Sequence, residues 1–240
     1  MQTKHATDFN RDVVPTVVCV NKATADLGVD FDKLVPALQK FLDDLFVPVW
    51  GTPAKLVKSS RPKPGYWHLI FLDNPEQRGA DSFHDITYSG MPVAKVFVKP
   101  ALKSDEVISV TACHELLEML VDPSATLWCD GPRGTVWAYE VCDVVEDEKI
   151  DFDGIAMSDF VYPAYFDMFR LKRLKSAQFD YLKKVRRPFQ ILAGGYSDIH
   201  KNGRVVTKFG SAEKKERFEN EDRRYHRSQF RRKRHKSHRS

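Results

Sequence analysis

The segment 104–123, SDEVISVTACHELLEMLVDP, constrains the fold more than any other stretch of this chain. As a helix turning about 100° per residue, it places His114, Glu115, Glu118 and Asp122 within one arc of about 100°, and apolar side chains cover roughly twice that arc. A helix on a protein surface needs a narrower apolar stripe than this. The segment therefore predicts a mostly buried helix that carries ionisable groups into the protein interior. Ser104 or Asp105 is expected to cap its start, and Pro123 to end it.

The charges around this segment favour metal binding over a solvated polar stripe. Solvated stripes usually mix both signs, yet between residues 103 and 149 there are eleven Asp and Glu residues and only one basic residue, Arg133. His114 and Glu118 belong to an HExxE motif, and they stand one helical turn apart on the same strip of the helix. Such a pair can bind a metal ion from one side, while Glu115 lies close enough to act on a metal-bound water.

The third protein ligand that an open zinc site requires has to be found elsewhere. Asp122 shares the helical face, but it lies about 12 Å along the axis from His114, which is too far for one compact site. As an alternative, Asp122 can cap the turn before Pro123. We therefore expect Glu140 as the third ligand, with Asp143 and Asp122 as less favoured choices.

Glu115 is the expected catalytic residue. In an HExxH enzyme the corresponding Glu takes a proton from the metal-bound water as that water attacks a carbonyl, and then passes the proton to the leaving group. Here Glu118 stands where that motif has its second His. Two carboxylate ligands neutralise a divalent cation, so the bound water should be less acidic than above a neutral His set. Zinc is the expected cofactor, although this donor set also admits a harder metal such as manganese or calcium.

The other segments predict a mixed α+β domain around this helix. Residues 135–148 fit either a short helix, with Glu140 and Asp143 along one side, or a strand, which would point them to opposite faces. His84 lies in the expected edge segment near the cleft, where it could contact a substrate; it is interpreted as a structural or exposed histidine. Apolar runs and periodicity predict strands at 13–20, 54–57, 66–72, 85–88 (an edge) and 92–98, helices at 31–46 and 172–187, and hairpins at 149–160 and 197–209.

Four segments resemble an uncharacterised group of bacterial and phage-encoded zincin-like proteins: HDITYSGMPVAKVFV, CHELLEMLVDP, WAYEVCDVVE and SDFVYPAYF. They lie between residues 84 and 166. The element order before the motif is similar to the N-terminal half of zincin metallopeptidases, in which the metal-bearing helix lies under a twisted sheet whose edge strand borders the cleft. The resemblance implies one zincin-like domain over residues 1–209, with a twisted mixed sheet packed on an N-terminal helix and on the metal-bearing helix.

This resemblance leaves several functions open. The first is a zinc-dependent peptidase that acts on a protein or peptide substrate, and the presence of Glu115 favours it. The second is a catalytically inactive zincin-like structural or virion-associated protein that contacts nucleic acid, and the absence of the second His favours it. A third is a peptidase-like toxin or maturation factor that its C-terminal tail directs to a target.

The C-terminal tail, residues 210–240, differs in charge from the rest of the chain. The net charge is +5, but residues 223–240 contain nine basic residues and no acid, which leaves 29 of the 38 basic residues against 33 acidic ones. We expect this tail to be helical at most in its first part and otherwise disordered, and to bind nucleic acid or another polyanion without base specificity. The alternative is a solubilising terminus. The candidate contact residues are Arg223, Arg224, Arg227, Arg231, Arg232, Lys233, Arg234, Lys236 and Arg239.

The cysteines and the N-terminus predict where the protein is located. The four cysteines form no CxxC pair, which favours free thiols in a reducing compartment. Residues 1–12 lack the pattern of a signal peptide, and the apolar run VVPTVVCV is too short to span a bilayer. We therefore expect a cytoplasmic protein, or a virion-associated one if it is phage-encoded, without membrane contact.

Overall fold

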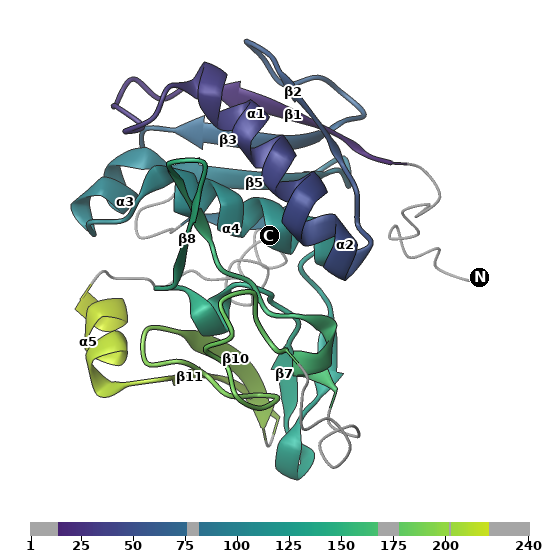
Figure 1. Cartoon of the computed structure of the whole chain (residues 1–240), viewed down its shortest axis with the longest axis vertical. Helices are drawn as coiled ribbons and strands as arrows, with labels where there is room; N and C mark the ends of the chain where they lie inside the picture. The colour runs from purple at the N-terminus through teal and green to yellow at the C-terminus, as the bar shows by residue number, and fades with distance from the viewer. Residues whose placement is uncertain (1–13, 76–81, 168–177, 202, 221–240) are drawn as a thin grey trace, which may run out of the picture.

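The computed structural model describes residues 14–75, 82–167, 178–201 and 203–220, and these residues form a mixed α+β protein. Figure 1 shows a larger sheet with helix α1 (Phe31–Phe41) in the upper part, and a smaller sheet with helix α5 (Ala212–Asn220) in the lower part. Helix α4 (Ile108–Val121) lies between them. None of the helices in the described ranges is long and apolar enough to cross a membrane.

The larger sheet has five strands in the order β2-β1-β3-β5-β4. β1 pairs in parallel with β2 and β3, β3 pairs in parallel with β5, and β4 closes one edge in antiparallel orientation. The continuous apolar run of β1 is buried, as expected for a strand that lies inside a sheet. The predicted strands and the predicted edge are confirmed. Their bounds are β1 Thr16–Asn21, β2 Lys55–Lys58, β3 Trp67–Leu72, β4 Phe83–Ile86 and β5 Pro92–Phe97.

The predicted N-terminal helix is present and continues further than expected. α1 spans Phe31–Phe41, and Asp30 is its N-cap: the Asp30 carboxylate accepts the Asp32 N–H at 2.9 Å. A π-helical turn, Leu42–Phe46, and α2, Val47–Trp50, extend it. Gly51, with a φ of 65°, ends the helical run in the left-handed region.

The helix expected over residues 104–123 is shorter at its N-terminus. α3 (Val98–Lys103) precedes it, and α4 itself spans Ile108–Val121. The expectation that Ser104 or Asp105 caps α4 is wrong, because the N-cap position belongs to Val107, which has no side-chain cap. Asp105 instead has a φ of 56° in the connection between the two helices.

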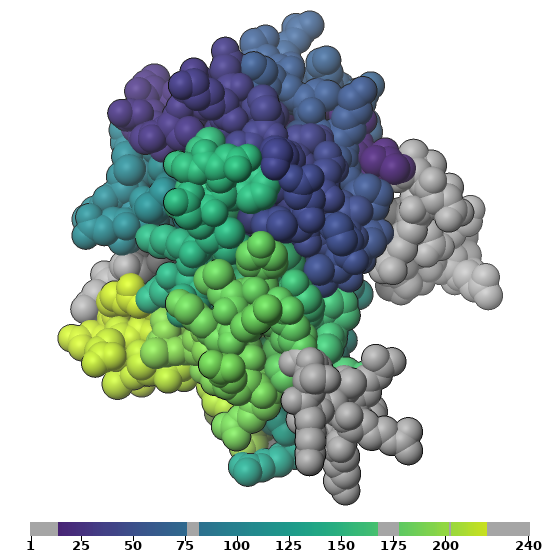
Figure 2. Space-filling view, viewed as in Figure 1, coloured from purple at the N-terminus to yellow at the C-terminus, as the bar shows by residue number. Residues whose placement is uncertain are grey.

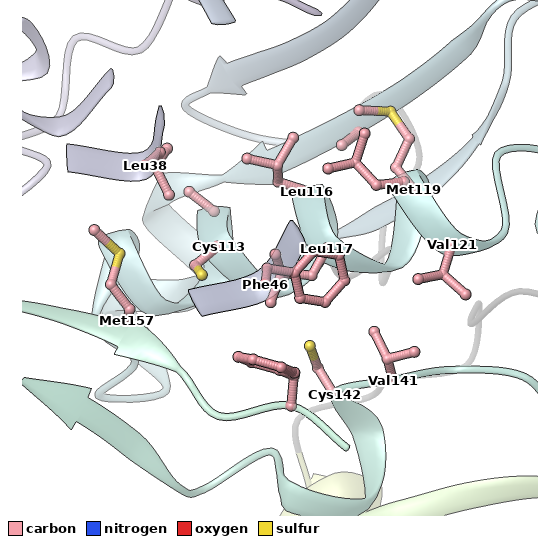
Figure 3. Packing of buried hydrophobic residues seen from close by; sticks show 14 of the residues in the cluster. Leu38, Phe46, Cys113, Leu116, Leu117, Met119, Val121, Val141, Cys142 and Met157 are labelled. Carbon is pink, nitrogen blue, oxygen red and sulfur yellow. The ribbon is translucent and has the colours of Figure 1, made fainter. Parts of the chain in front are cut away.

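The predicted burial of α4 is confirmed. Every residue of α4 except Thr111 is buried. Figure 3 shows Leu116 and Leu117 of α4 among apolar side chains of other segments, including Phe46 and Cys142. Because packing surrounds the helix, its ionisable residues are held in fixed positions rather than exposed to solvent.

The lower part contains an antiparallel sheet in the order β11-β10-β7-β6. A separate hairpin, β8–β9, turns at Asp153 and Gly154, whose positive φ values of 53° and 81° fit a type I′ turn. Figure 2 shows this hairpin against the N-terminal helical segment. The rings of Phe152 in the hairpin and Phe41 in α1 meet edge to face, with their centroids 5.3 Å apart. Both predicted hairpins are confirmed. The bounds are β6 Trp128–Asp130, β7 Val136–Ala138, β8 Lys149–Phe152, β9 Ile155–Ser158, β10 Tyr196–Lys201 and β11 Arg204–Phe209, with 3-10 turns at Pro132–Gly134, Asp143–Val145 and Pro163–Phe166.

The folded part of the chain continues past the expected domain boundary at residue 209. α5 (Ala212–Asn220) packs on the β10–β11 hairpin, where the ring of Phe218 lies 5.1 Å from that of Phe209 and 5.2 Å from that of Tyr196. Lys214, only 4% exposed, forms ion pairs with Glu146 and with Asp147. The first part of the predicted tail is therefore a docked helix.

The basic helix expected at residues 172–187 is not formed by its described part. Residues 178–187 contain a bridge between Val161 and Asp180 and a turn, and they are not helical. Asp180 accepts the N–H groups of Lys184 and Val185, which closes a loop in place of a helical turn. Residues 168–177 lie outside the described ranges.

Candidate metal centre

His114, Glu118 and Asp143 form a compact set of potential metal ligands. Nε2 of His114 lies 3.3 Å from Oε2 of Glu118 and 3.3 Å from Oδ1 of Asp143. One ligand atom from each of the three residues lies within 4.8 Å of the others, and all three residues are buried. The structure thus brings His114 and Glu118 together as the helical spacing predicts, and adds Asp143.

Asp143 takes the place that the sequence analysis gives to Glu140. The chain leaves β7 after Ala138 and enters the 3-10 turn Asp143–Val145, so residues 135–148 are neither a continuous helix nor a continuous strand. The Cys142 N–H donates to Oε1 of Glu118 at 3.1 Å and fastens this turn to α4. The carboxylate of Glu140 groups with His84 and Asp122 instead.

His84 lies at the centre of the ionisable residues, although the sequence analysis treats it as structural or exposed. Its Nδ1 lies 3.6 Å from Oε2 of Glu118 and 3.7 Å from Oε2 of Glu115, and its Nε2 lies 3.8 Å from Oε2 of Glu140. Its position in the edge strand beside the helix is the one sequence signal that points to this role. In the antiparallel register His84 pairs with Ala94, and this pairing brings the ring to α4.

Asp122 acts as a turn cap, as the alternative interpretation expects. It is fully buried, and its two carboxylate oxygens accept the N–H groups of Thr126 at 3.0 Å and Leu127 at 2.8 Å. One of its oxygens also lies within 4.8 Å of ligand atoms of His84 and Glu140. We refer to the buried ionisable side chains of this region as the metal-centre group: His84, His114, Glu115, Glu118, Asp122, Glu140 and Asp143.

The pKa values of the histidines are raised by the carboxylates around them. Burial alone would lower the pKa of His84, but Glu140, Glu115 and Glu118 outweigh it and raise this pKa to about 9. Burial also acts to lower the pKa of His114, but the carboxylates of Glu118 and Asp143 outweigh it and raise this pKa well above the usual value for histidine. Without a cation, protons on the two rings therefore balance part of the carboxylate charge.

The carboxyl groups respond in opposite directions. Burial raises the pKa of Glu115, and burial together with the nearby Glu118 raises that of Asp143 to about 7. Burial also acts to raise the pKa of Glu118, yet the neighbouring His114 and His84 lower it. Among Glu115, Glu118 and Asp143, Glu118 is thus the one whose anionic form is favoured, which suits it to bind a cation that replaces the histidine protons.

The metal-centre group is connected to a cleft. A cavity of about 50 Å³ is lined by His84, His114, Glu115, Glu118, Glu140 and Asp143 among others, and no Lys or Arg of the described ranges lines it. His114 and Glu115 also line a neighbouring cleft of about 250 Å³. The rim of this cleft carries both charge signs, from Glu106, Glu146, Asp147, Lys149, Lys214 and Arg217. A ligand in the cleft can therefore reach His114 and Glu115.

The nine basic residues predicted to contact nucleic acid, from Arg223 to Arg239, lie outside the described ranges. Their role stays a prediction from the sequence.

The fold and the site define a mixed α+β protein with a buried group of His, Glu and Asp side chains that can hold a metal ion. No family model, curated protein or solved structure matches this chain.

Proposed function

We propose that this protein is a zincin-like, metal-dependent hydrolase that cleaves peptide bonds and holds zinc through His114, Glu118 and Asp143. The observation that carries the proposal is the convergence of these three ligands around the inner cavity of about 50 Å³. This cavity shares His114 and Glu115 with the neighbouring cleft of about 250 Å³. Two carboxylates and one imidazole suit zinc, and also admit manganese.

Glu115 is the general base in this proposal. It follows the ligand His114 directly on α4, and its side chain lines both the inner cavity and the cleft. Burial raises its pKa, so its carboxylate accepts a proton more readily than an exposed one. A bound zinc would polarise a peptide carbonyl and make its water more acidic. Glu115 would then receive the proton of the attacking water and donate it to the amine that leaves.

The larger sheet supports the zincin-like part of the proposal. β4 is an antiparallel edge strand, and it lies alongside α4. In the zincin arrangement an edge strand borders the cleft above the metal-bearing helix. A peptide can add to such an edge through main-chain hydrogen bonds, which places its carbonyl groups in sequence-independent positions.

A second candidate function is a catalytically inactive, zincin-like structural protein that contacts nucleic acid through its basic tail. The raised pKa values of His84 and His114 favour it, because two protonated rings neutralise part of the buried carboxylate charge without any metal. In this alternative the metal-centre group is a network of buried ion pairs. The two candidates differ in whether the folded protein binds zinc and in whether it cleaves peptides.

Zinc analysis and a peptidase assay on the same samples test the proposal. Wild type, His114→Ala and Glu115→Gln are dialysed, reconstituted with zinc and incubated with a fluorescent protein substrate and a peptide library. We expect His114→Ala to lose the zinc ion bound at His114 and to lose cleavage. Glu115→Gln should keep this zinc ion and lose cleavage by about 100-fold or more. The exposed Glu219→Gln serves as the matched control and should behave as wild type.

Two outcomes would reject the hydrolase proposal. If the wild-type protein takes up no zinc after reconstitution, the hydrolase proposal is rejected and the metal-centre group is a network of buried ion pairs. A wild-type protein that binds zinc at His114 but cleaves none of the substrates would reject the peptidase activity, and it would also reject the metal-free ion-pair network.

A further inference from the structure

We infer that the protein has a second divalent-cation site, formed by His84, Asp122 and Glu140. One ligand atom from each of these residues lies within 4.8 Å of the other two. They come from three separate elements: the edge strand β4, the C-terminal end of α4 and the loop after β7. This site goes beyond the proposed hydrolase, since none of its ligands belongs to the His114 set.

The ring of His84 provides an observation that is independent of the acidic cluster. His84 is only 6% exposed, and its Nε2 has no hydrogen-bond partner among the described residues. This nitrogen points toward the carboxylate of Glu140, 3.8 Å away, which is too long for a hydrogen bond. Buried polar atoms of native proteins nearly always have a partner, so an unpartnered imidazole nitrogen calls for one. A cation between Nε2 and the carboxylate would be that partner.

The opposite side of the same ring fits the usual surroundings of a metal-bound histidine. A histidine that binds a metal through one nitrogen generally donates the N–H of the other to a carboxylate or carbonyl, which fixes the tautomer. Nδ1 of His84 faces the carboxylates of Glu115 and Glu118 at 3.7 Å and 3.6 Å. These distances exceed hydrogen-bond length, and the two carboxylates are the groups toward which its N–H would be directed. With the proton on Nδ1, the lone pair of Nε2 is directed at the proposed cation.

A cation on the Nδ1 side is less favourable. His84, Glu115 and Glu118 also lie within 4.8 Å of one another. However, Oε2 of Glu118 is the same atom that approaches His114 at 3.3 Å. A cation at Nδ1 would share this oxygen with a cation at His114, whereas the Nε2 side has Glu140 and Asp122 as carboxylates of its own.

The charge balance of the metal-centre group also favours two cations. The group contains five carboxylates and two histidines, and no Lys or Arg of the described chain lines the inner cavity. One divalent cation at His114 leaves an excess of negative charge even if His84 is protonated, and buried charge without a counter-charge is strongly unfavourable. The cavity of about 50 Å³ has room for more than a single water.

The ligand chemistry identifies the class of cation. One imidazole and two carboxylates suit Zn²⁺ or Mn²⁺ better than a soft metal. Such a cation would connect β4 to α4 and to the loop after β7, and so hold the edge strand in place beside the cleft.

The number of zinc ions per chain tests the inference. Native mass spectrometry of the zinc-reconstituted protein should find two zinc ions per chain in the wild type and one zinc ion per chain in His84→Gln and in Glu140→Gln. His114→Ala should also count one, and the double variant His84→Gln with His114→Ala should count none. His68→Gln is the matched control, because His68 is also buried in the large sheet but its Nε2 already accepts the Lys63 N–H at 3.0 Å.

The wild-type count keeps the test valid if a variant fails to fold. One zinc per wild-type chain, unchanged in His84→Gln and lost in His114→Ala, would overturn the second site and leave the hydrolase proposal intact. Two zinc ions that both persist in His114→Ala would reject the His114 site instead. Loss of a zinc in Glu115→Gln but not in Glu140→Gln would overturn the proposed ligand set and move the cation to Nδ1.

Discussion

Two groups of buried carboxylates in this protein are neutralised in different ways. Asp159 and Asp180 are both fully buried, and backbone amides donate to both. The Phe160 N–H donates to Oδ1 of Asp159 at 2.8 Å, and the N–H groups of Lys184 and Val185 donate to Asp180 at 2.9 Å and 3.0 Å. Oδ2 of Asp159 has no hydrogen-bond partner among the described residues. Burial and the adjacent Asp180 raise the pKa of Asp159 to about 8, so this pair retains a proton at neutral pH.

The metal-centre group contains two imidazole rings among its carboxylates. The rings of His84 and His114 approach carboxylate oxygens at 3.3 to 3.8 Å, and one ring nitrogen, Nε2 of His84, has no hydrogen-bond partner in the described ranges. The comparison teaches that buried acids alone do not indicate a cation. Backbone donors and a shared proton can stabilise a carboxylate pair, whereas converging imidazole nitrogens and carboxylates form a ligand set.

The largest expected effect that separates the two groups is stabilisation by zinc. At about 1,000 times its dissociation constant, zinc should raise the free energy of unfolding by about 4 kcal/mol per site, since it binds the folded chain. Urea unfolding with zinc or with EDTA measures the difference. Asp159→Asn should keep the whole gain, and His114→Ala should lose the share of one site, about 4 kcal/mol. An equal gain in all three proteins would mean that zinc binds elsewhere.

A smaller effect is expected at the amide-bound pair. Asp180→Ala removes the acceptor of the buried Val185 N–H and of the part-buried Lys184 N–H, so the free energy of unfolding should fall by about 2–3 kcal/mol. The zinc content should stay unchanged. Asp180→Asn keeps one acceptor oxygen, so its free energy of unfolding should fall by less. If Asp180→Ala also removed zinc, the two groups would not be independent.

The smallest effect concerns pH. The folded pKa of Asp159, about 8, lies above the usual value for an unfolded carboxyl group, so the folded state binds more protons. The stability contribution of this pair is therefore complete below about pH 4 and is lost as the pH rises toward 8, by about 1 kcal/mol between pH 6 and 7. Urea unfolding of wild type and Asp159→Asn in EDTA at these two pH values measures it. An identical pH dependence in both proteins would contradict the raised pKa.

Much of the upper part of the fold could be predicted because its signals are local. β1 is a run of β-branched residues, and α1 shows apolar residues at helical spacing with Asp30 as its cap. The hairpins follow from turn residues that tolerate a positive φ, such as Gly154. The sequence did not predict the start of α4 correctly. It also did not predict that α5 docks on the fold, because α5 is rich in charged residues and its contacts through Phe218 and Lys214 are tertiary.

The zincin-like assignment, the peptidase activity, the zinc and the nucleic-acid contacts of the tail stay predictions. The structure adds the ligand geometry that makes the first three testable.

The sequence by itself determined the buried helix and the pairing of His114 with Glu118. That pairing depends only on the rise and turn of a helix, which bring the side chains of residues i and i+4 to one face. Only the tertiary structure decided that Asp143 lies beside His114 and Glu118, and that His84, thirty residues before His114, lies at the centre of the whole metal-centre group. The path of the loop after β7 and the register of the edge strand β4 set these positions, and both depend on packing between segments distant in the chain rather than on any local pattern.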